Sequence, residues 1–219
     1  MKGLMMEQPL LVASLLMHAE RHHADQEVVS RRVEGDIHRY RFADLATRSR
    51  RMANALASLD IKPGDRVGTL AWNGYRHMEL YFAASGSGAV LHTINPRLHI
   101  DQLAYIVEHA DDRVICFDLG FLSIIEALAL RMTKPRLFVA MCDSSHMPPP
   151  NHSNVAMLCY EDLIDAHADD YAWPQLDENT ASSLCYTSGT TGNPKGVLYS
   201  HRSTVLHTYA AALPDALKL

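Results

Sequence analysis

The chain has 219 residues, 47% of them hydrophobic, so it can bury a sizeable core, and disorder is not expected. Lys and Arg number 20 against 25 for Asp and Glu, which gives a formal charge of −5 and excludes a strongly basic, nucleic-acid-binding protein. The length fits one large domain or one and a half small ones.

The four cysteines are far apart and form no CxxC pair, which argues against a zinc ribbon or a thioredoxin-like redox site. Each lies in or beside an apolar run: Cys116, Cys142, Cys159 and Cys185. We therefore expect reduced, buried thiols and a cytoplasmic protein.

The most apolar stretch near the amino terminus covers only residues 10–17, which is too short to span a bilayer, and no cleavage site of a secretory signal follows it. We predict an amphipathic helix here and no transmembrane segment. His18 and His22 are four residues apart and could share a helix face as metal ligands. No third ligand has a suitable spacing, so we assign no metal site.

Residues 27–42 alternate loosely around Glu34-Gly35-Asp36, which predicts a β-hairpin. A helix over residues 43–59 should follow and end before the turn sequence at residues 62–65. Three arginines of this helix lie opposite its apolar stripe: Arg48, Arg50 and Arg51. We expect them on a solvated face, without a functional role.

Apolar strands and helices then alternate along the chain. The predicted strands are residues 67–71, 89–94, 114–117 and 137–141, and the helices between them are residues 75–85, 99–109 and 122–130. Strands separated by helices need crossover connections, so the fold class is α/β, with the hairpin and first long helix followed by a largely parallel, helix-covered sheet. Gly86-Ser87-Gly88 resembles the start of a dinucleotide-binding fingerprint, but it follows a helix and not a strand, and Leu91 stands where the last glycine should be. We therefore predict that these glycines form a helix-ending turn.

Residues 147–151 include three prolines and predict a surface loop. A short strand at 155–158, a helix at 161–168 and an acidic connection through 169–178 should follow.

The segment from Leu184 to His201 predicts two strands joined by a loop, and this loop contains the candidate binding residues. The loop contains four hydroxyl residues, two glycines and a lysine: Thr187, Ser188, Thr190, Thr191, Gly189, Gly192 and Lys195. The glycines let backbone amides approach an oxyanion, the hydroxyls can donate to phosphate oxygens, and the ammonium supplies a compact positive charge. This composition favours a phosphate-binding loop.

The loop is not a Walker A motif, because Pro194-Lys195-Gly196 stands where that motif needs Gly-Lys-Ser/Thr. A hairpin loop without a chemical role is the remaining alternative, since Ser, Thr and Gly are common in turns.

The order hydroxyl, Gly, Thr-Thr-Gly, any residue, Pro-Lys-Gly resembles the phosphate-binding signature of the AMP-forming adenylating superfamily, which includes acyl-CoA synthetases, luciferases and peptide-synthetase adenylation domains. Four further segments of the chain resemble family segments and occur in the same order as in the family: residues 40–45, 64–68, 95–98 and 200–202. Asn95-Pro96-Arg97-Leu98 looks most like the fatty acid–CoA ligase branch, medium-chain members in particular.

The resemblance implies that residues 1–219 are the amino-terminal part of a large adenylation domain. It implies an enzyme that uses ATP with Mg²⁺ to convert a carboxylic acid, a fatty acid by its branch, to an acyl-adenylate and then passes the acyl group to coenzyme A. Thr187 to Lys195 would hold the β- and γ-phosphates, with Lys195 as the catalytic residue. His201 and Arg202 could act as an acid and an anion clamp, but because they follow the second strand, we expect them to be structural and to cap a helix that begins near Ser203.

In this family the adenine, ribose and acid sites, and a small mobile domain, lie beyond the equivalent of Lys195. We therefore expect a truncated chain that binds ATP weakly and forms no acyl-adenylate alone. The alternative is a non-catalytic module that binds a nucleotide or a partner protein. Such a module would leave its sheet partly uncovered and would oligomerise, as a homodimer for instance, through an exposed apolar patch.

Overall fold

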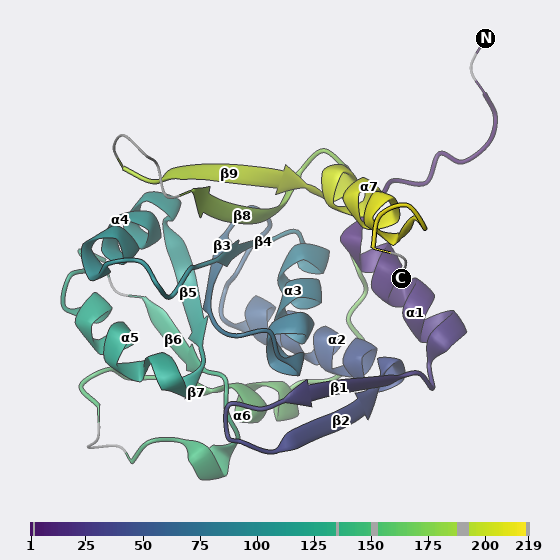
Figure 1. Ribbon diagram of the computed structural model, residues 1–219. Helices are drawn as coiled ribbons and strands as arrows, with labels where there is room; N and C mark the ends of the chain where they lie inside the picture. Colours follow the sequence, from purple (N-terminus) through teal and green to yellow (C-terminus); the bar gives the residue numbers. More distant parts are fainter. Residues whose placement is uncertain (2, 135, 150–152, 188–192, 218–219) are drawn as a thin grey trace.

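A computed structural model describes residues 1, 3–134, 136–149, 153–187 and 193–217. The chain folds into a two-stranded sheet and a seven-stranded sheet with helices on both faces (Figure 1). This arrangement confirms the predicted α/β class.

The predicted amino-terminal helix, hairpin and long helix are confirmed. They are α1 (Val12–His23), β1 (Glu27–Arg31), β2 (Ile37–Arg41) and α2 (Phe42–Ser58), and the two strands pair antiparallel. Tyr40 of the hairpin is buried with Leu16 of α1 and Leu45 of α2. This contact holds the hairpin against the helices.

The large sheet has the strand order β7-β6-β5-β3-β4-β8-β9, and every neighbouring pair is parallel except β8 and β9. Its strands are β3 (Arg66–Leu70), β4 (Val90–Thr93), β5 (Asp112–Phe117), β6 (Leu137–Ala140), β7 (Leu158–Cys159), β8 (Ala181–Thr187) and β9 (Lys195–Ser200). Its helices are α3 (Tyr75–Ser87), α4 (Ile100–Ala110), α5 (Leu122–Ala129), α6 (Tyr160–Asp165) and α7 (His201–Ala212), with 3₁₀ turns at Leu119–Phe121 and Ser144–His146.

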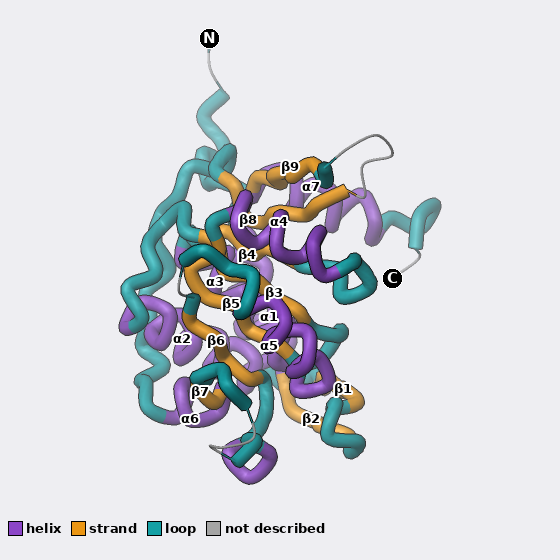
Figure 2. Tube along the Cα trace, turned by 90° about the vertical axis from the view of Figure 1, so that its left-hand side faces the viewer, coloured by secondary structure: helices purple, strands orange, loops and turns teal. Residues whose placement is uncertain are grey.

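Helices α2, α3 and α6 cover one face of this sheet, and α4 and α5 cover the other (Figures 1 and 2). The chain changes face because the connection from β4 to β5 passes over β3, which lies between them in the sheet. Strands covered on both sides are apolar along their length, as in Val114–Phe117 of β5, where every side chain is buried.

The structure shifts three predicted boundaries. The strand predicted at 155–158 is only Leu158–Cys159, since it pairs with two residues of β6 at the sheet edge. The helix after it ends at Asp165, three residues early. Helix α7 begins at His201, because the Ser200 side chain caps it by accepting the Ser203 N–H at 3.1 Å. The helix-ending turn is confirmed at Gly88, which caps α3 at φ 90°.

The predicted solvated face of α2 is wrong for Arg48 and Arg50. The Arg48 guanidinium lies 2.7 Å from a Glu79 oxygen and 3.0 Å from a Glu161 oxygen, and the Glu79 side chain is fully buried. Arg50 makes an ion pair with a carboxylate of α1, and Arg51 is more loosely placed, 3.8 Å from a carboxylate of α6. Arg48 is three residues after Leu45 and four before Met52, so it lies beside the apolar stripe of α2 and not opposite it.

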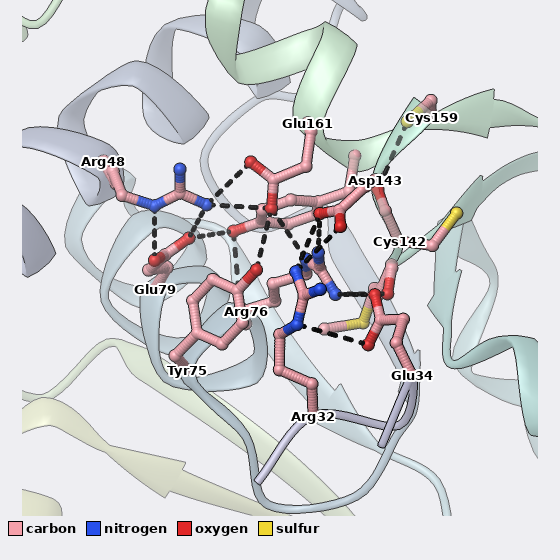
Figure 3. Close-up of polar contacts among 12 residues, drawn as sticks. Arg32, Glu34, Arg48, Tyr75, Arg76, Glu79, Cys142, Asp143, Cys159 and Glu161 are labelled. Atoms are coloured by element: carbon pink, nitrogen blue, oxygen red, sulfur yellow. Dashed lines mark hydrogen bonds and ion pairs between the residues drawn. The ribbon is translucent and has the colours of Figure 1, made fainter. Parts of the chain in front are cut away.

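Arg48 belongs to a larger network centred on Arg76 (Figure 3). Arg76 contacts carboxylate oxygens of Glu34 at 2.7 Å, Asp143 at 2.5 Å and Glu161 at 2.7 Å. These residues come from the hairpin turn, the segment after β6 and helix α6. The network ties three distant parts of the chain to α3.

The last elements expose apolar side chains. Leu198 of β9 is 61% exposed, and Tyr209 of α7 is 59% exposed.

Among the described residues, no helix combines the length and the apolar character that a membrane crossing requires.

Candidate functional site

The ends of the predicted phosphate-binding loop are brought together by the β8–β9 hairpin. Thr187 ends β8, Lys195 begins β9, and the two lie opposite each other in the antiparallel ladder. The Thr187 hydroxyl donates to the Lys195 carbonyl oxygen at 3.5 Å, and both residues are exposed. The other predicted residues fall outside the described residues: Ser188, Gly189, Thr190, Thr191 and Gly192.

The carboxyl end of β8, at Thr187, lies at the edge of the sheet where β3, β4, β5 and β6 have their carboxyl ends, because β8 runs parallel to β4. Open α/β sheets bind ligands outside that edge. Within the described part of the chain, the Lys195 ammonium has no carboxylate within ion-pair distance. Its positive charge is therefore not neutralised by those residues.

Gly196 of the Pro-Lys-Gly sequence has a packing role that the sequence did not reveal. It lies opposite Tyr186 in the ladder, and a Cβ at position 196 would come within 3.2 Å of both the Tyr186 ring and Leu184. Glycine at this position makes room for the ring.

A buried histidine–aspartate pair lies under the same hairpin. His92 Nδ1 is 2.8 Å from an Asp112 oxygen, and both side chains are fully buried. Sequence reasoning missed this pair, since the residues are 20 positions apart and lie on different strands. Burial raises the pKa of Asp112, and the bond from His92 opposes that rise.

Three loops meet at the carboxyl edge beside β3. The Trp72 N–H after β3 donates to the Asp118 carboxylate after β5 at 2.7 Å. Arg97, from the Asn-Pro-Arg-Leu segment after β4, lies over the Trp72 ring with its guanidinium carbon 6.0 Å from the centroid. Burial raises the pKa of Asp118 to about 6. The arrangement fixes the predicted segment 95–98 at this edge.

An open groove of about 890 Å³ passes beside Thr93, the last residue of β4. Helix α1, strand β1 and helix α3 give it apolar side chains, including Leu15, Val29, Met78, Tyr81 and Phe82. Thr93 itself lies opposite Cys185 of β8, two residues before Thr187. The groove therefore adjoins the strand that leads into the predicted phosphate-binding segment.

The remaining candidate residues are structural. Val12 N–H donates to His201 Nδ1 at 3.3 Å, and Arg202 pairs with Glu178 at 2.5 Å. Burial lowers the pKa of His201. Both residues make contacts within the fold, as expected, but the prediction that they cap the helix is wrong, because they lie inside α7 and Ser200 is the cap.

The cysteines form no disulfide, and Cys116, Cys142 and Cys159 are buried as predicted, while Cys185 is half-buried. Burial raises the pKa of Cys116 and of Cys142 to about 12. These two thiols are poor nucleophiles at neutral pH.

One group among the described residues has the spacing of metal ligands: Glu34, Asp143 and His146. Arg76 lies 2.7 Å from Glu34 and 2.5 Å from Asp143, so a guanidinium already neutralises these carboxylates. Their charge serves the ion-pair network.

Comparison with known proteins covers nearly the whole chain. A family model described as "AMP-binding enzyme" matches residues 16–218. The 3-methylmercaptopropionyl-CoA ligase of Ruegeria lacuscaerulensis is 50% identical over 99% of this chain and 40% of its own length. The medium-chain-fatty-acid–CoA ligase of Ectopseudomonas oleovorans is 48% identical over 100% of this chain and 40% of its own length. The chain thus spans about two fifths of these relatives.

Among solved structures, the anthranilate CoA ligase AuaEII in complex with anthranoyl-AMP superposes with a TM-score of 0.76. The match covers 90% of this chain and 36% of that protein, at 22% identity. At this identity the likeness establishes the fold.

Proposed function

Since the chain belongs to the AMP-binding enzyme family, we propose that it supplies the polyphosphate-binding part of an ATP-dependent, AMP-forming ligase that joins a fatty acid to coenzyme A. The observation that carries this proposal is the pairing of Thr187 with Lys195 across the hairpin, at the carboxyl edge of a parallel sheet. A threonine and a lysine lie opposite each other there, at the two ends of a segment rich in Gly and Thr.

In the proposed reaction, an oxygen of the acid carboxylate attacks the α-phosphorus of ATP. The bond from that phosphorus to the oxygen bridging to the β-phosphorus breaks, and pyrophosphate leaves with its charge. The thiol sulfur of coenzyme A then attacks the acyl carbon, and AMP leaves. Lys195 acts on the first step, because a fixed cation stabilises the negative charge that grows on the departing pyrophosphate.

The described ends of the segment fit a polyphosphate. Lys195 and Thr187 offer a cation and a hydroxyl donor, and both are exposed. In the proposal, Mg²⁺ accompanies ATP, because this ion usually binds proteins together with substrate phosphates. It would supply further charge neutralisation on the β- and γ-phosphates, which Thr187 to Lys195 would hold.

Two observations support an aliphatic acid. One similar ligase is named for medium-chain fatty acids and the other for 3-methylmercaptopropionyl-CoA, at 48% and 50% identity. The groove beside Thr93 is lined by apolar side chains, which suits a carbon chain.

The test is calorimetric titration of the 219-residue chain with MgATP, magnesium pyrophosphate and AMP. Recognition of the terminal phosphates predicts binding of MgATP and pyrophosphate, and binding of AMP at least tenfold weaker. Lys195→Ala should weaken MgATP about 10-fold or more, because hydrogen bonds to charged groups contribute about 1.5–3 kcal/mol. The matched control is Lys62→Ala, which removes an exposed lysine before β3, at the opposite edge of the sheet.

Equal affinity of the Lys195→Ala chain and the wild type would overturn the assignment of Lys195. Binding of AMP as tight as that of MgATP would overturn recognition through the terminal phosphates. Release of pyrophosphate, measured with and without a medium-chain acid, separates a catalytic chain from a module that only binds the nucleotide.

A further inference from the structure

The carboxyl end of β8 is held by a hydrogen bond that the proposed function does not use. The hydroxyl of Tyr186 is hydrogen-bonded to Nδ1 of His109, with 2.6 Å between the two atoms. Tyr186 directly precedes Thr187, and His109 lies in the last turn of α4. The bond therefore ties a helix to the strand one residue before the predicted phosphate-binding segment. Figure 2 shows α4 running beside β8 and β9.

His109 is itself held in place. Its ring stacks on that of Tyr105, one helical turn earlier, with centroids 5.4 Å apart and an interplanar angle of 26°. Because α4 packs on the sheet through buried Leu103, Ile106 and Val107, its last turn holds His109 beside Tyr186.

The buried His92–Asp112 pair supports the ring of Tyr186 from the sheet. The centroids of the His92 and Tyr186 rings are 5.1 Å apart. His92 on β4 reaches Asp112 on β5 across β3, where Gly68 has no side chain; a Cβ there would lie 3.2 Å from the Asp112 carboxyl carbon. Asp112 orients the imidazole, and His92 Nε2 is buried without a hydrogen-bond partner among the described residues.

Gly196 completes the enclosure from β9, since any side chain there would meet the Tyr186 ring. Three separate elements thus converge on one tyrosine: α4 through His109, β4 through His92, and β9 through Gly196. Tyr186 is next in the chain to Thr187, and Gly196 is next to Lys195, which are the described residues of the predicted phosphate-binding segment.

We infer that Tyr186 is a positioning residue, which sets Thr187 and Lys195 in place for the terminal phosphates of ATP through its bond to His109 and its packing on His92. This inference rests on the proposed function. The tyrosine does not contact the nucleotide; it acts through the ladder pairs Tyr186–Gly196 and Thr187–Lys195.

The experiment is a double-mutant cycle read in MgATP affinity, measured by calorimetry on the full chain. Tyr186→Phe removes only the hydroxyl and should weaken MgATP about 3- to 10-fold, the loss of one neutral hydrogen bond. His109→Leu should weaken it equally, and the double variant no further, because both changes break the same bond. His109→Gln retains an acceptor and should restore affinity close to that of the wild type.

Tyr105→Phe is the matched control. It removes a tyrosine hydroxyl from the same cluster, and among the described residues that hydroxyl makes no hydrogen bond. Its MgATP affinity should equal that of the wild type. The urea midpoint of each variant shows whether the chain remains folded.

The outcomes separate the two ideas. A wild-type chain that does not bind MgATP refutes the proposed function and the positioning role with it. A wild type that binds, together with a Tyr186→Phe chain of equal affinity, refutes the positioning role alone. If a variant does not fold, hydrogen exchange of the wild type decides: the amides of Tyr186 and Gly196 must become better protected on MgATP binding, and unchanged exchange overturns the inference.

Discussion

Replacing Arg76 with methionine tests how much the buried network contributes to stability. The Arg76 side chain is only 6% exposed and contacts three carboxylates, of which Glu34 is 5% exposed. It also donates to the Met141 carbonyl oxygen at 3.0 Å. Methionine approximates the length of the arginine stem, so the substitution removes the guanidinium with little change in packing.

We expect Arg76→Met to lower the free energy of unfolding by about 3–5 kcal/mol, because removing one partner of a buried pair leaves uncompensated buried charge. Arg39→Met is the matched control. Arg39 lies 2.7 Å from Glu27, the same distance as Arg76 from Glu34, but these side chains are 59% and 49% exposed. Exposed pairs contribute about 0–1 kcal/mol.

Urea unfolding, followed by the fluorescence of Trp72 and Trp173, gives both values in one assay. For a chain of this size the expected loss corresponds to a fall in Tm of roughly 6–20 °C for Arg76→Met. Similar losses for the two variants, each below about 1 kcal/mol, would refute the reasoning, because burial would then not distinguish two pairs of equal length.

Two further changes test other parts of the structure. Asp118→Asn should stabilise the chain at pH 7 but not at pH 4. Burial raises the pKa of Asp118 to about 6, so the folded state binds a proton more tightly than the unfolded state. The stability that this bound proton contributes is lost as pH rises from about 4 through about 6. The difference from wild type should approach roughly 3 kcal/mol in urea unfolding; a difference that does not change with pH would contradict the sign. Gly86→Ala should destabilise by about 1–3 kcal/mol and shift tryptophan emission, because its Cβ would lie 2.6 Å from the Trp173 ring. Gly74→Ala, where a Cβ has open space, is the control, and equal effects of the two alanines would argue against the overpacking.

The order of helices and strands could be predicted because periodicity is a local property. Apolar runs such as residues 114–117 and helical spacing such as residues 43–59 depend only on near neighbours, and both became elements within a few residues of the expected bounds. Predicted ends were least reliable where the element is short: β7 has two residues, which pair with only the last two residues of β6.

The candidate site was found in part. The spacing of Thr187 and Lys195 predicted a hairpin, and the structure places them opposite each other. Phosphate binding by the whole segment from Thr187 to Lys195 stays a prediction. The residues that hold the hairpin, Tyr186 with His109 and His92, gave no sequence signal, since His109 is 77 positions from Tyr186.

The arginines of α2 show most clearly that the sequence alone does not predict the partners of charged side chains. From sequence, a charged residue opposite an apolar stripe is assigned to solvent, because water is the default partner of a charge. Arg48 instead meets carboxylates 31 and 113 residues away. The sequence alone therefore determined the class of fold and the alternation of its elements, both of which follow from neighbouring residues. Only the tertiary structure decided which polar groups become partners, because pairing depends on which distant elements the sheet order places side by side.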